Sequence, residues 1–393
     1  MSNCTSPDDE SLLNCTSEFH LPATDTQDPQ NNIDTGLVSM ETYLAVDGVL
    51  EKAVYPLLIT ALALNAISSM VFSHSSMQGP TSTYLLAYSV NQLLYISLSL
   101  GHTILGTVYG DQAVEKVLYL AFSLYVSNFV TGSLRRIMYQ LNVFVCLARF
   151  VLVTVRFKYR NCRLLKTPSL WIGAAFAITF AFHLQVVFKY EISKIIKPNN
   201  QTTYSFGLSE MYMKHRTGFL VLSLFNKITF VYVLVLLCLV LNMCVLYALK
   251  RHGRKRRTIT TCLRNSGSHR RERQTTLAVF WSTLAFVVLS LPTVTDSLAS
   301  TLLPSHYGFH SKQRYLYLLM QKIGNTSALF SLTAHFLFHA CFSSNFRSTL
   351  RVVVCRCFRR GKIKTRPIEM EGLYNQFPRE NVNSVAMEII YRS

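Results

Sequence analysis

Three arginines lie inside one apolar stretch of the chain, which runs from about Val117 to Tyr159. Arg135 and Arg136 are near the middle of this stretch, and Arg149 is near its end. A cation at the centre of a membrane helix costs roughly 2.5 to 3.5 kcal/mol on insertion scales, so such residues usually face a bundle interior and a partner. The three arginines are therefore the first candidates for ligand binding or switching.

The composition predicts the element that must hold these arginines. Of the 393 residues, 50% are hydrophobic and only 15% are charged, whereas a soluble globular chain carries about 25% charged residues. Crossing a hydrocarbon core takes about 20 apolar residues. Segments of that length lie near 53–73, 80–101, 117–149, 168–188, 217–249, 276–303 and 315–342. We expect an all-α fold, a bundle of seven transmembrane helices over residues 53–342.

The distribution of charge gives the expected orientation and excludes nucleic acid as the partner. The connectors after the third and fifth segments and the C-terminal tail hold 5, 10 and 10 Lys and Arg, whereas residues 1–52 hold one, beside ten Asp and Glu. Positively charged loops stay in the cytoplasm, so the N-terminus is predicted outside and the C-terminus inside. The formal net charge of +19 then belongs to a membrane-facing and cytoplasmic surface.

The N-terminal region, residues 1–52, is polar and acidic and lacks the pattern of a cleavable signal peptide. We expect an extracellular disordered tail. Sequons for N-glycosylation begin at Asn3, Asn14 and Asn200, all on the predicted outer side. Together they predict a multi-pass glycoprotein of the plasma membrane.

Residues 343–360 alternate apolar and basic side chains at helical spacing and are too few to cross a bilayer. They predict an amphipathic cytoplasmic helix at the membrane interface. Cys355 and Cys357 in this segment are candidates for palmitoylation. Residues 361–393 are polar and are expected to be a disordered cytoplasmic tail.

Sequence patterns of enzymes and metal proteins are missing. The chain has no glycine-rich phosphate loop, paired catalytic carboxylates or nucleophile arrangement, and its ten cysteines show no metal-ligand spacing. We expect neither enzymatic activity nor a bound metal or cofactor.

Arg135 precedes Arg149 by 14 residues, which at 100° per residue places it about 40° away on the same helix face, four turns toward the outside. We expect Arg135 to point into a pocket and Arg136 to point toward a neighbouring helix. Lys227 and Lys322 could join Arg135 in a cationic outer cavity. Such a cavity suits a carboxylate or another anion.

A second interpretation of the same arginines has equal weight. Arg135 and Arg136 would then satisfy internal carbonyl groups or the hydroxyls of Tyr139 and Tyr125. Neither arginine would contact a ligand in that case.

Several segments resemble those of the rhodopsin-like (class A) G-protein-coupled receptors. Residues 148–160 are similar to the Asp-Arg-Tyr motif and its following loop, and residues 286–292 to Phe-x-x-Cys-Trp-x-Pro. Residues 335–339, followed by 345–347, are similar to Asn-Pro-x-x-Tyr and its short helix. Asn65 matches the asparagine of the family's first helix. The resemblance covers roughly residues 50–360 and implies a receptor.

The departures from the family pattern mark a divergent member. Family residues are replaced by Ala148 (Asp), Ser290 (Trp), His335-Phe336 (Asn-Pro), His339 (Tyr) and Leu234 (helix-five Pro). No Cys lies near Leu124 or between the fourth and fifth segments, so the family's usual disulfide cannot form.

The resemblance implies a cytoplasmic latch between Arg149 and Glu272, which breaks when the sixth helix swings out and frees Arg149 to contact a G protein. Alternatively, Arg149 extends to a lipid phosphate. Because Ala148 cannot hold Arg149 as the family's Asp does, we expect raised basal signalling. The remaining candidates for coupling and switching are Asn242, Phe286, Ser290, Pro292, His335 and His339.

Two implications concern small ligands. The positions of the family's sodium site are Gln92, Met138 and His335, so no carboxylate is available and sodium should not regulate the protein. Thr131 stands where aminergic members have Asp, so a biogenic amine is not expected. The candidate ligand contacts are Arg135, Thr131, Lys227 and Lys322, and the ligand is predicted to be a peptide or a small anionic or chemosensory molecule.

The predicted function is a receptor that binds this extracellular ligand, sits among membrane lipids and activates a heterotrimeric G protein. A seven-helix transporter or channel is an alternative, because intramembrane cations and histidines can line a pathway. A receptor-like protein that binds ligand without coupling is a further one. Nucleotide exchange on G proteins separates the first from the other two.

Overall fold

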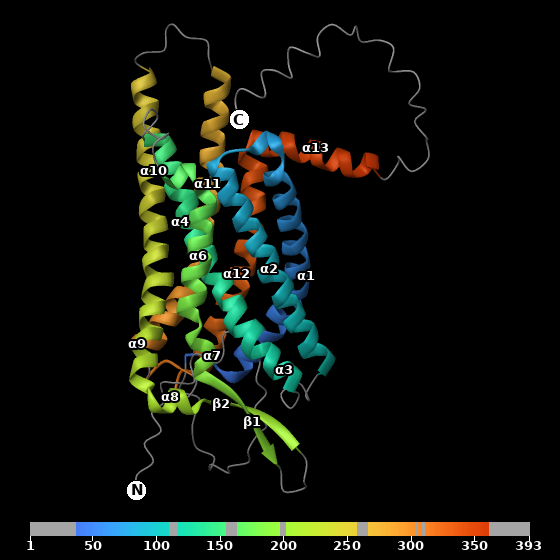
Figure 1. Cartoon of the computed structure of the whole chain (residues 1–393), viewed down its shortest axis with the longest axis vertical. Helices are drawn as coiled ribbons and strands as arrows, with labels where there is room; N and C mark the ends of the chain where they lie inside the picture. The colour runs from blue at the N-terminus through green and yellow to red at the C-terminus, as the bar shows by residue number, and fades with distance from the viewer. Residues whose placement is uncertain are drawn as a thin grey trace, which may run out of the picture. The chain divides into compact units, whose positions relative to one another are not determined.

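The computed structural model describes residues 37–109, 117–154, 163–196, 202–257, 266–303, 305–308 and 311–360. Residues up to Leu350 belong to one compact unit and residues from Arg351 to another. The first unit contains a bundle of long helices that run side by side, with a β-hairpin at one end (Figure 1). That end is called the outer end below, and the opposite end, where α4 finishes and α11 begins, the inner end.

Seven long helical segments make up the described bundle. They are α1 (Met40–Ser73), α2 (Pro80–Tyr109), the continuous helix of α3 (Val117–Ala121), η4 (Phe122–Thr131) and α4 (Gly132–Thr154), the pair α6 (Pro168–His183) and α7 (Gln185–Lys189), the continuous helix of α9 (Arg216–Lys227), η6 (Ile228–Val233) and α10 (Leu234–Arg257), α11 (Ser266–Leu302) and α12 (Arg314–Phe342). The η4 and η6 segments are π-helical. Short helical turns η2 (Ser75–Met77), α5 (Arg163–Lys166) and α8 (Glu210–Lys214) lie in the connections, and α13 (Ser344–Arg360) follows.

Five of these segments are long and apolar enough to cross a membrane: 40–73, 117–154, 168–189, 216–251 and 273–302. The two others, α2 and α12, are long enough but carry more polar residues. Buried amides and histidines occupy these helices, at Asn91, Gln92 and His102 in α2 and at His335 and His339 in α12. Their polar faces are directed into the bundle rather than toward lipid.

The first helix starts earlier than the apolar pattern predicts. Residues 40–52 were assigned to a disordered tail, but α1 begins at Met40. Ser39 caps the helix, because its hydroxyl accepts a hydrogen bond from the Thr42 amide at 3.2 Å. Hydropathy identifies only the apolar residues that cross the membrane. The polar turns before them are helical because Ser39 caps the helix and Asp47 pairs with Lys322 on α12. Residues 1–36, including Asn3 and Asn14, lie outside the described residues.

The chain is mostly helical, as predicted, but the two strands between α7 and α8 were not predicted. Strands β1 (Tyr190–Ile196) and β2 (Thr202–Leu208) form an antiparallel hairpin, with Tyr190 opposite Leu208 and Ile196 opposite Thr202. The sequence held a signal for it: two runs rich in β-branched and aromatic residues flank Pro198-Asn199-Asn200. Asn200 itself lies outside the described residues.

The hairpin is attached at its base through Lys189. This lysine is only 7% exposed, and its ammonium lies 5.1 Å from the ring centroid of Tyr190 and 4.9 Å from that of Tyr212. A cation between two aromatic faces is a favourable contact. It joins the end of α7 to β1 and α8.

The helix of α4 lies at the centre of the bundle. Of the apolar stretch in 117–154, 61% is buried, against 17% for 168–189. Two buried clusters meet on α4. One joins it to α1, α2 and α12 through residues such as Leu58, Ile96, Ile137 and Leu332, and the other joins it to α10 and α11 through Cys146, Cys238 and Phe286. A residue on α4 can therefore contact almost every part of the bundle.

The helix after the bundle agrees with the predicted helix at 343–360. Its first turn is anchored by Phe346, which is fully buried and packs against Phe72 with ring centroids 5.3 Å apart. Cys355 is exposed. The side chain of Cys357 and residues 361–393 lie outside the described part of the chain.

Candidate functional site

Arg135 lines a cavity near the middle of the bundle. The guanidinium Nη2 donates to the Tyr95 hydroxyl at 2.9 Å and to the Asn325 amide oxygen at 3.5 Å, and it lies 5.7 Å from the centroid of the Tyr95 ring. Arg135 thus links α4 to α2 and α12. The Tyr95 hydroxyl and the Asn325 amide are neutral groups.

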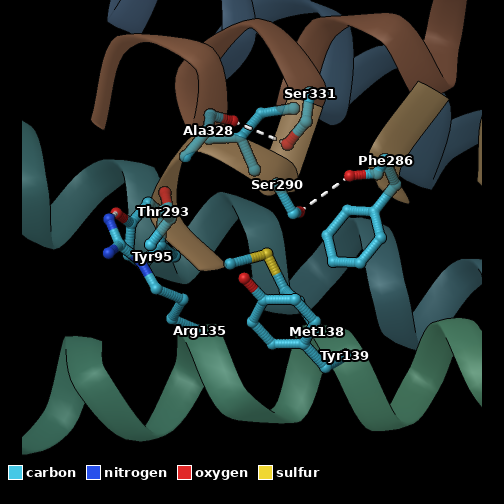
Figure 2. A pocket seen from close by; sticks show the side chains of 10 residues that line it. Tyr95, Arg135, Met138, Tyr139, Phe286, Ser290, Thr293, Ala328 and Ser331 are labelled. Carbon is cyan, nitrogen blue, oxygen red and sulfur yellow. Dashed lines mark hydrogen bonds between the residues drawn. The ribbon is translucent and has the colours of Figure 1, made fainter. Parts of the chain in front are cut away.

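The cavity beside Arg135 has a volume of about 20 Å³. That is room for about one water molecule. Figure 2 shows Arg135 and Tyr139 on α4 facing Ser290 and Thr293 on α11. The full lining is Tyr95, Arg135, Met138, Tyr139, Phe286, Ser290, Thr293, Ala328, Ser331 and Leu332. Four helices therefore enclose it: α2, α4, α11 and α12.

Two of the predicted switch residues, Phe286 and Ser290, line this cavity from α11, beside Thr293. The Ser290 hydroxyl donates to the Phe286 carbonyl at 2.7 Å (Figure 2), and the Phe286 ring packs against Tyr139 with centroids 5.0 Å apart. Pro292, another switch candidate, lies inside α11, which continues as one helix from Ser266 to Leu302. The candidate switch residues on α11 and the candidate ligand contact on α4 thus line the same cavity.

The other predicted ligand contacts do not line this cavity. The ammonium of Lys322 is 2.9 Å from the carboxylate of Asp47 on α1, and Lys227 donates to the Thr301 hydroxyl at 3.4 Å. Thr131 is buried, and its hydroxyl bonds the Ser127 carbonyl one turn earlier. The structure does not bring the three cations together.

Sequence reasoning missed two acidic residues of the outer half. Asp47 pairs with Lys322, and Asp296 accepts a hydrogen bond from the Tyr307 hydroxyl at 2.6 Å. Asp296 is also close enough to Lys227 to interact with its charge. A carboxylate inside the sixth apolar segment was a usable signal, because an intramembrane acid marks a functional or paired position.

Tyr307 lies in the connection between α11 and α12. Burial, and next the hydrogen bond to Asp296, raise the pKa of its phenol well above the ordinary value. The phenol therefore stays protonated and acts as the donor to Asp296. This contact ties the outer connection to α11.

Arg136 points away from the cavity, into a three-helix junction. Its Nη1 lies 2.9 Å from His183 Nε2 on α6, and its Nε donates to the Asn226 amide oxygen on α9 at 3.1 Å. The junction is close-packed at Gly132, where an added Cβ would lie 2.9 Å from the His183 ring. The His183 and Asn226 partners could not be found from the sequence alone, because they depend on how α6 and α9 are rotated.

The inner half of the bundle holds the remaining switch candidates. Asn242 on α10 accepts from the Thr283 hydroxyl on α11 at 2.9 Å, and the Cys146 thiol on α4 lies 3.8 Å from the same oxygen. These contacts join three helices. A displacement of α11 relative to α4 would therefore change the contacts of Asn242 with Thr283 and Cys146.

Two histidines lie one turn apart on α12. His335 and His339 are 4% and 1% exposed, with ring centroids 4.7 Å apart, and the His335 ring lies 4.9 Å from that of Tyr88. Within the described residues, His335 Nε2 and both ring nitrogens of His339 lack a hydrogen-bond partner. Gln92 is completely buried, and its amide nitrogen and oxygen also lack a hydrogen-bond partner within the described residues.

Arg149 is buried, with 8% of its surface exposed, and its charge acts on the nearby His339. Glu272 belongs to α11, but its side chain lies outside the described residues. The latch between Arg149 and Glu272 therefore stays a prediction. Among the described side chains, no three of His, Cys, Asp and Glu gather as metal ligands.

The sequence was compared with known protein families. Residues 55–357 match the family described as serpentine type 7TM GPCR chemoreceptor Srw. No curated protein sequence matches the chain. The matched stretch includes the cavity at Arg135, the Arg136 junction, the histidine pair and Arg149.

Proposed function

Because the chain belongs to the Srw family of serpentine G-protein-coupled chemoreceptors, we propose that it binds a small anionic or peptide ligand outside the cell and activates a heterotrimeric G protein inside. The family is a receptor family, and the chain is a multi-pass membrane protein of the plasma membrane. The proposed roles of single residues in coupling follow from the resemblance to rhodopsin-like receptors, which is more specific than membership of the Srw family.

The proposed topology has seven spans and an outer N-terminus. Five helices have the length and composition of spans, and α2 and α12 supply the other two. Both pack against α1 within the bundle, and their polar residues are buried. The Lys and Arg content of the connectors supports the orientation.

The observation that carries the ligand proposal is Arg135 at the wall of a cavity shared by four helices. A ligand carboxylate is a stronger acceptor for a guanidinium than a phenol or an amide, because both partners are charged and two parallel hydrogen bonds can form. It would therefore replace Tyr95 and Asn325 as acceptors. The proposed ligand contact is Arg135, and Lys227, Lys322 and Thr131 would belong to the entrance above it.

Ligand binding at this cavity requires the helices to move apart. The volume of about 20 Å³ is too small for an organic ligand, and Gly324 on α12 is so close to α11 that an added Cβ would lie 2.8 Å from the Thr293 hydroxyl and 3.3 Å from its Cα. A ligand would favour the state in which α11 has shifted. Its binding free energy would shift the population toward that state.

At the inner end, we propose that the shift of α11 breaks the contact between Arg149 and Glu272. Arg149 would then contact the G protein. Ala148 is buried beside it with no polar group, so the closed state lacks one contact that holds the arginine in relatives of the rhodopsin type. Basal activity should therefore be raised, and Ala148→Asp should lower it.

The experiment is a screen of small carboxylates and peptides on cells that express the chain, with Arg135→Ala and Arg135→Lys beside the wild type. Loss of the response to every agonist in Arg135→Ala, at normal surface expression, supports the pocket. Arg163→Ala, a change at an exposed arginine, is the control. An unchanged response in Arg135→Ala contradicts the pocket.

A further inference from the structure

The helices α4 and α10 pack side by side (Figure 1). Residues near their inner ends line a groove. Its volume is about 810 Å³, within the roughly 300 to 1,000 Å³ of small-molecule sites. It is lined by Phe150, Thr154, Met243, Cys244, Tyr247, Ala248 and Arg251. The groove is separate from the cavity at Arg135 and takes no part in the proposed ligand binding.

The lining has a direction. Met243, Tyr247 and Arg251 are spaced four residues apart, so they form one row along α10, and Cys244 and Ala248 form the neighbouring row. The row begins with an apolar thioether and ends with a guanidinium. Met243, Tyr247 and Arg251 are all exposed, and across the groove Phe150 precedes Thr154 by one turn of α4.

The charged end lies where lipid headgroups should be. The apolar helix 216–251 has 36 residues, which span about 54 Å at 1.5 Å per residue. A bilayer with its headgroups is roughly 40 to 45 Å thick, so the helix is long enough to cross the hydrocarbon core and reach the headgroup region at its inner end. Arg251 is the last of these residues. Beyond it the helix continues through four more basic residues to Arg257.

We propose that this groove binds an anionic phospholipid of the cytoplasmic leaflet, with its phosphate and acidic headgroup at Arg251 and one acyl chain along Met243 and Phe150. The apolar end of the groove matches the acyl chain of such a lipid, and the cationic end at Arg251 matches its headgroup. A neutral lipid would fill the apolar part but would gain less at Arg251. The assignment of the groove to the cytoplasmic leaflet rests on the proposed receptor topology.

The site lies directly beside the coupling residue. Phe150 follows Arg149 in the chain, and the two side chains leave α4 on different faces, since Arg149 is buried and Phe150 lines the groove. A lipid in the groove would hold the inner ends of α4 and α10 in one arrangement. It would thereby act on the surface that the G protein uses.

Cys244 offers a native probe, since it is a free, partly exposed thiol of the groove. The purified chain is placed in nanodiscs of phosphatidylcholine with or without phosphatidylserine and treated with N-ethylmaleimide. Labelling of each cysteine is followed by peptide mass spectrometry. The exposed Cys341 serves as the internal reference for the reagent, and neither ligand nor G protein is needed.

Phosphatidylserine should slow the labelling of Cys244 about five-fold relative to Cys341, the preference that one cation gains at an anionic surface. Arg251→Gln should abolish the difference, whereas Arg273→Gln, a change at another exposed arginine, should keep it. Soluble glycerophosphoserine should give no protection, because it lacks the acyl chain.

Three results would overturn the lipid site: equal labelling in both nanodiscs, equal loss of protection in Arg251→Gln and Arg273→Gln, or full protection by glycerophosphoserine. Because the readout is binding alone, a failed agonist screen would leave this result standing. Failure of the lipid site would likewise leave the receptor proposal intact.

Discussion

The charged contacts of the outer half and the α12 histidine pair of the inner half differ in how they are bonded, although His102 and His183 in the outer half also leave one ring nitrogen without a partner among the described residues. In the outer half, Arg136 contacts His183 and Asn226, and the partly exposed Lys322 pairs with Asp47. In the inner half, the two α12 histidines and the amide of Gln92 have nitrogen or oxygen atoms without partners among the described residues.

This difference indicates where the molecule can change. Bonded charges hold helices in one arrangement, because separating them leaves a buried charge unpaired. Buried polar groups with unused hydrogen-bonding capacity cost free energy, and another arrangement or entering water can recover part of it. We infer that the outer half fixes the helices around the ligand cavity and that the inner half is the two-state element.

Arg136→Ala should have the largest effect on the outer half. It removes a cation that bonds two other helices, and each hydrogen bond to a charged group contributes about 1.5 to 3 kcal/mol. We expect a loss of about 3 kcal/mol and a fall of several degrees in the melting temperature of the purified protein, with reduced surface expression. Arg163→Ala, at an exposed site, should change neither. A melting temperature that stays constant in Arg136→Ala would show that the junction does not hold the outer half.

Gly324→Ala tests the contact between α11 and α12. The new methyl group would overlap the Thr293 hydroxyl, and such overpacking costs about 1 to 3 kcal/mol. Because the helices would be forced apart beside the cavity, basal nucleotide exchange should rise. The matched control is Gly173→Ala on α6, where nothing lies within 4 Å; it should be neutral or stabilise by up to about 1 kcal/mol. Equal effects of the two changes would argue against the close contact.

His339→Leu tests the inner half and should stabilise the protein. The imidazole has unpartnered nitrogens within the described residues, so an apolar side chain of similar size should raise the unfolding free energy by about 1 kcal/mol. Asn65→Leu is the contrast, because the Asn65 amide donates to the Ala61 carbonyl at 2.9 Å and to the Leu332 carbonyl at 3.1 Å. It should destabilise. If both changes lower the melting temperature, bound water already satisfies His339 and the comparison between the halves fails.

Lys322→Met should have the smallest effect. The pair with Asp47 is partly exposed, with 28% and 18% of the two side chains accessible, and such pairs contribute less than about 1 kcal/mol. We expect a change in melting temperature close to the error of the measurement, and no added change when Asp47→Asn is combined with it. A large loss would mean that this pair, rather than the Arg136 junction, holds the outer half.

Much of the helical framework could be predicted from the sequence. The apolar segments overlap the long helices, and α2 and α6 begin at Pro80 and Pro168, the first residues of the second and fourth segments. The predicted start of the first helix was wrong, and the hairpin was not predicted. Hydropathy indicates which segments are apolar enough to cross a membrane, but it does not identify capped polar helical turns or short strands.

The site was harder to predict than the framework. A helical wheel separates Arg135 from Arg136, but the partners of each come from other helices whose rotation no local pattern contains. Lys227 and Lys322 were grouped with Arg135 by charge. In the structure Lys322 pairs with Asp47, and Lys227 lies near Asp296. Neither of these acidic residues was considered in the prediction from the sequence.

Coupling is the central claim, and nucleotide exchange tests it most directly. Once the screen has supplied an agonist, its effect is measured on purified heterotrimeric G protein with wild-type receptor and with Arg149→Ala, which binding assays should show to retain the agonist. We expect the agonist to accelerate exchange with the wild type and not with Arg149→Ala. An agonist that binds the wild type without accelerating exchange on any G protein would contradict the proposal and would favour a receptor-like protein that does not couple.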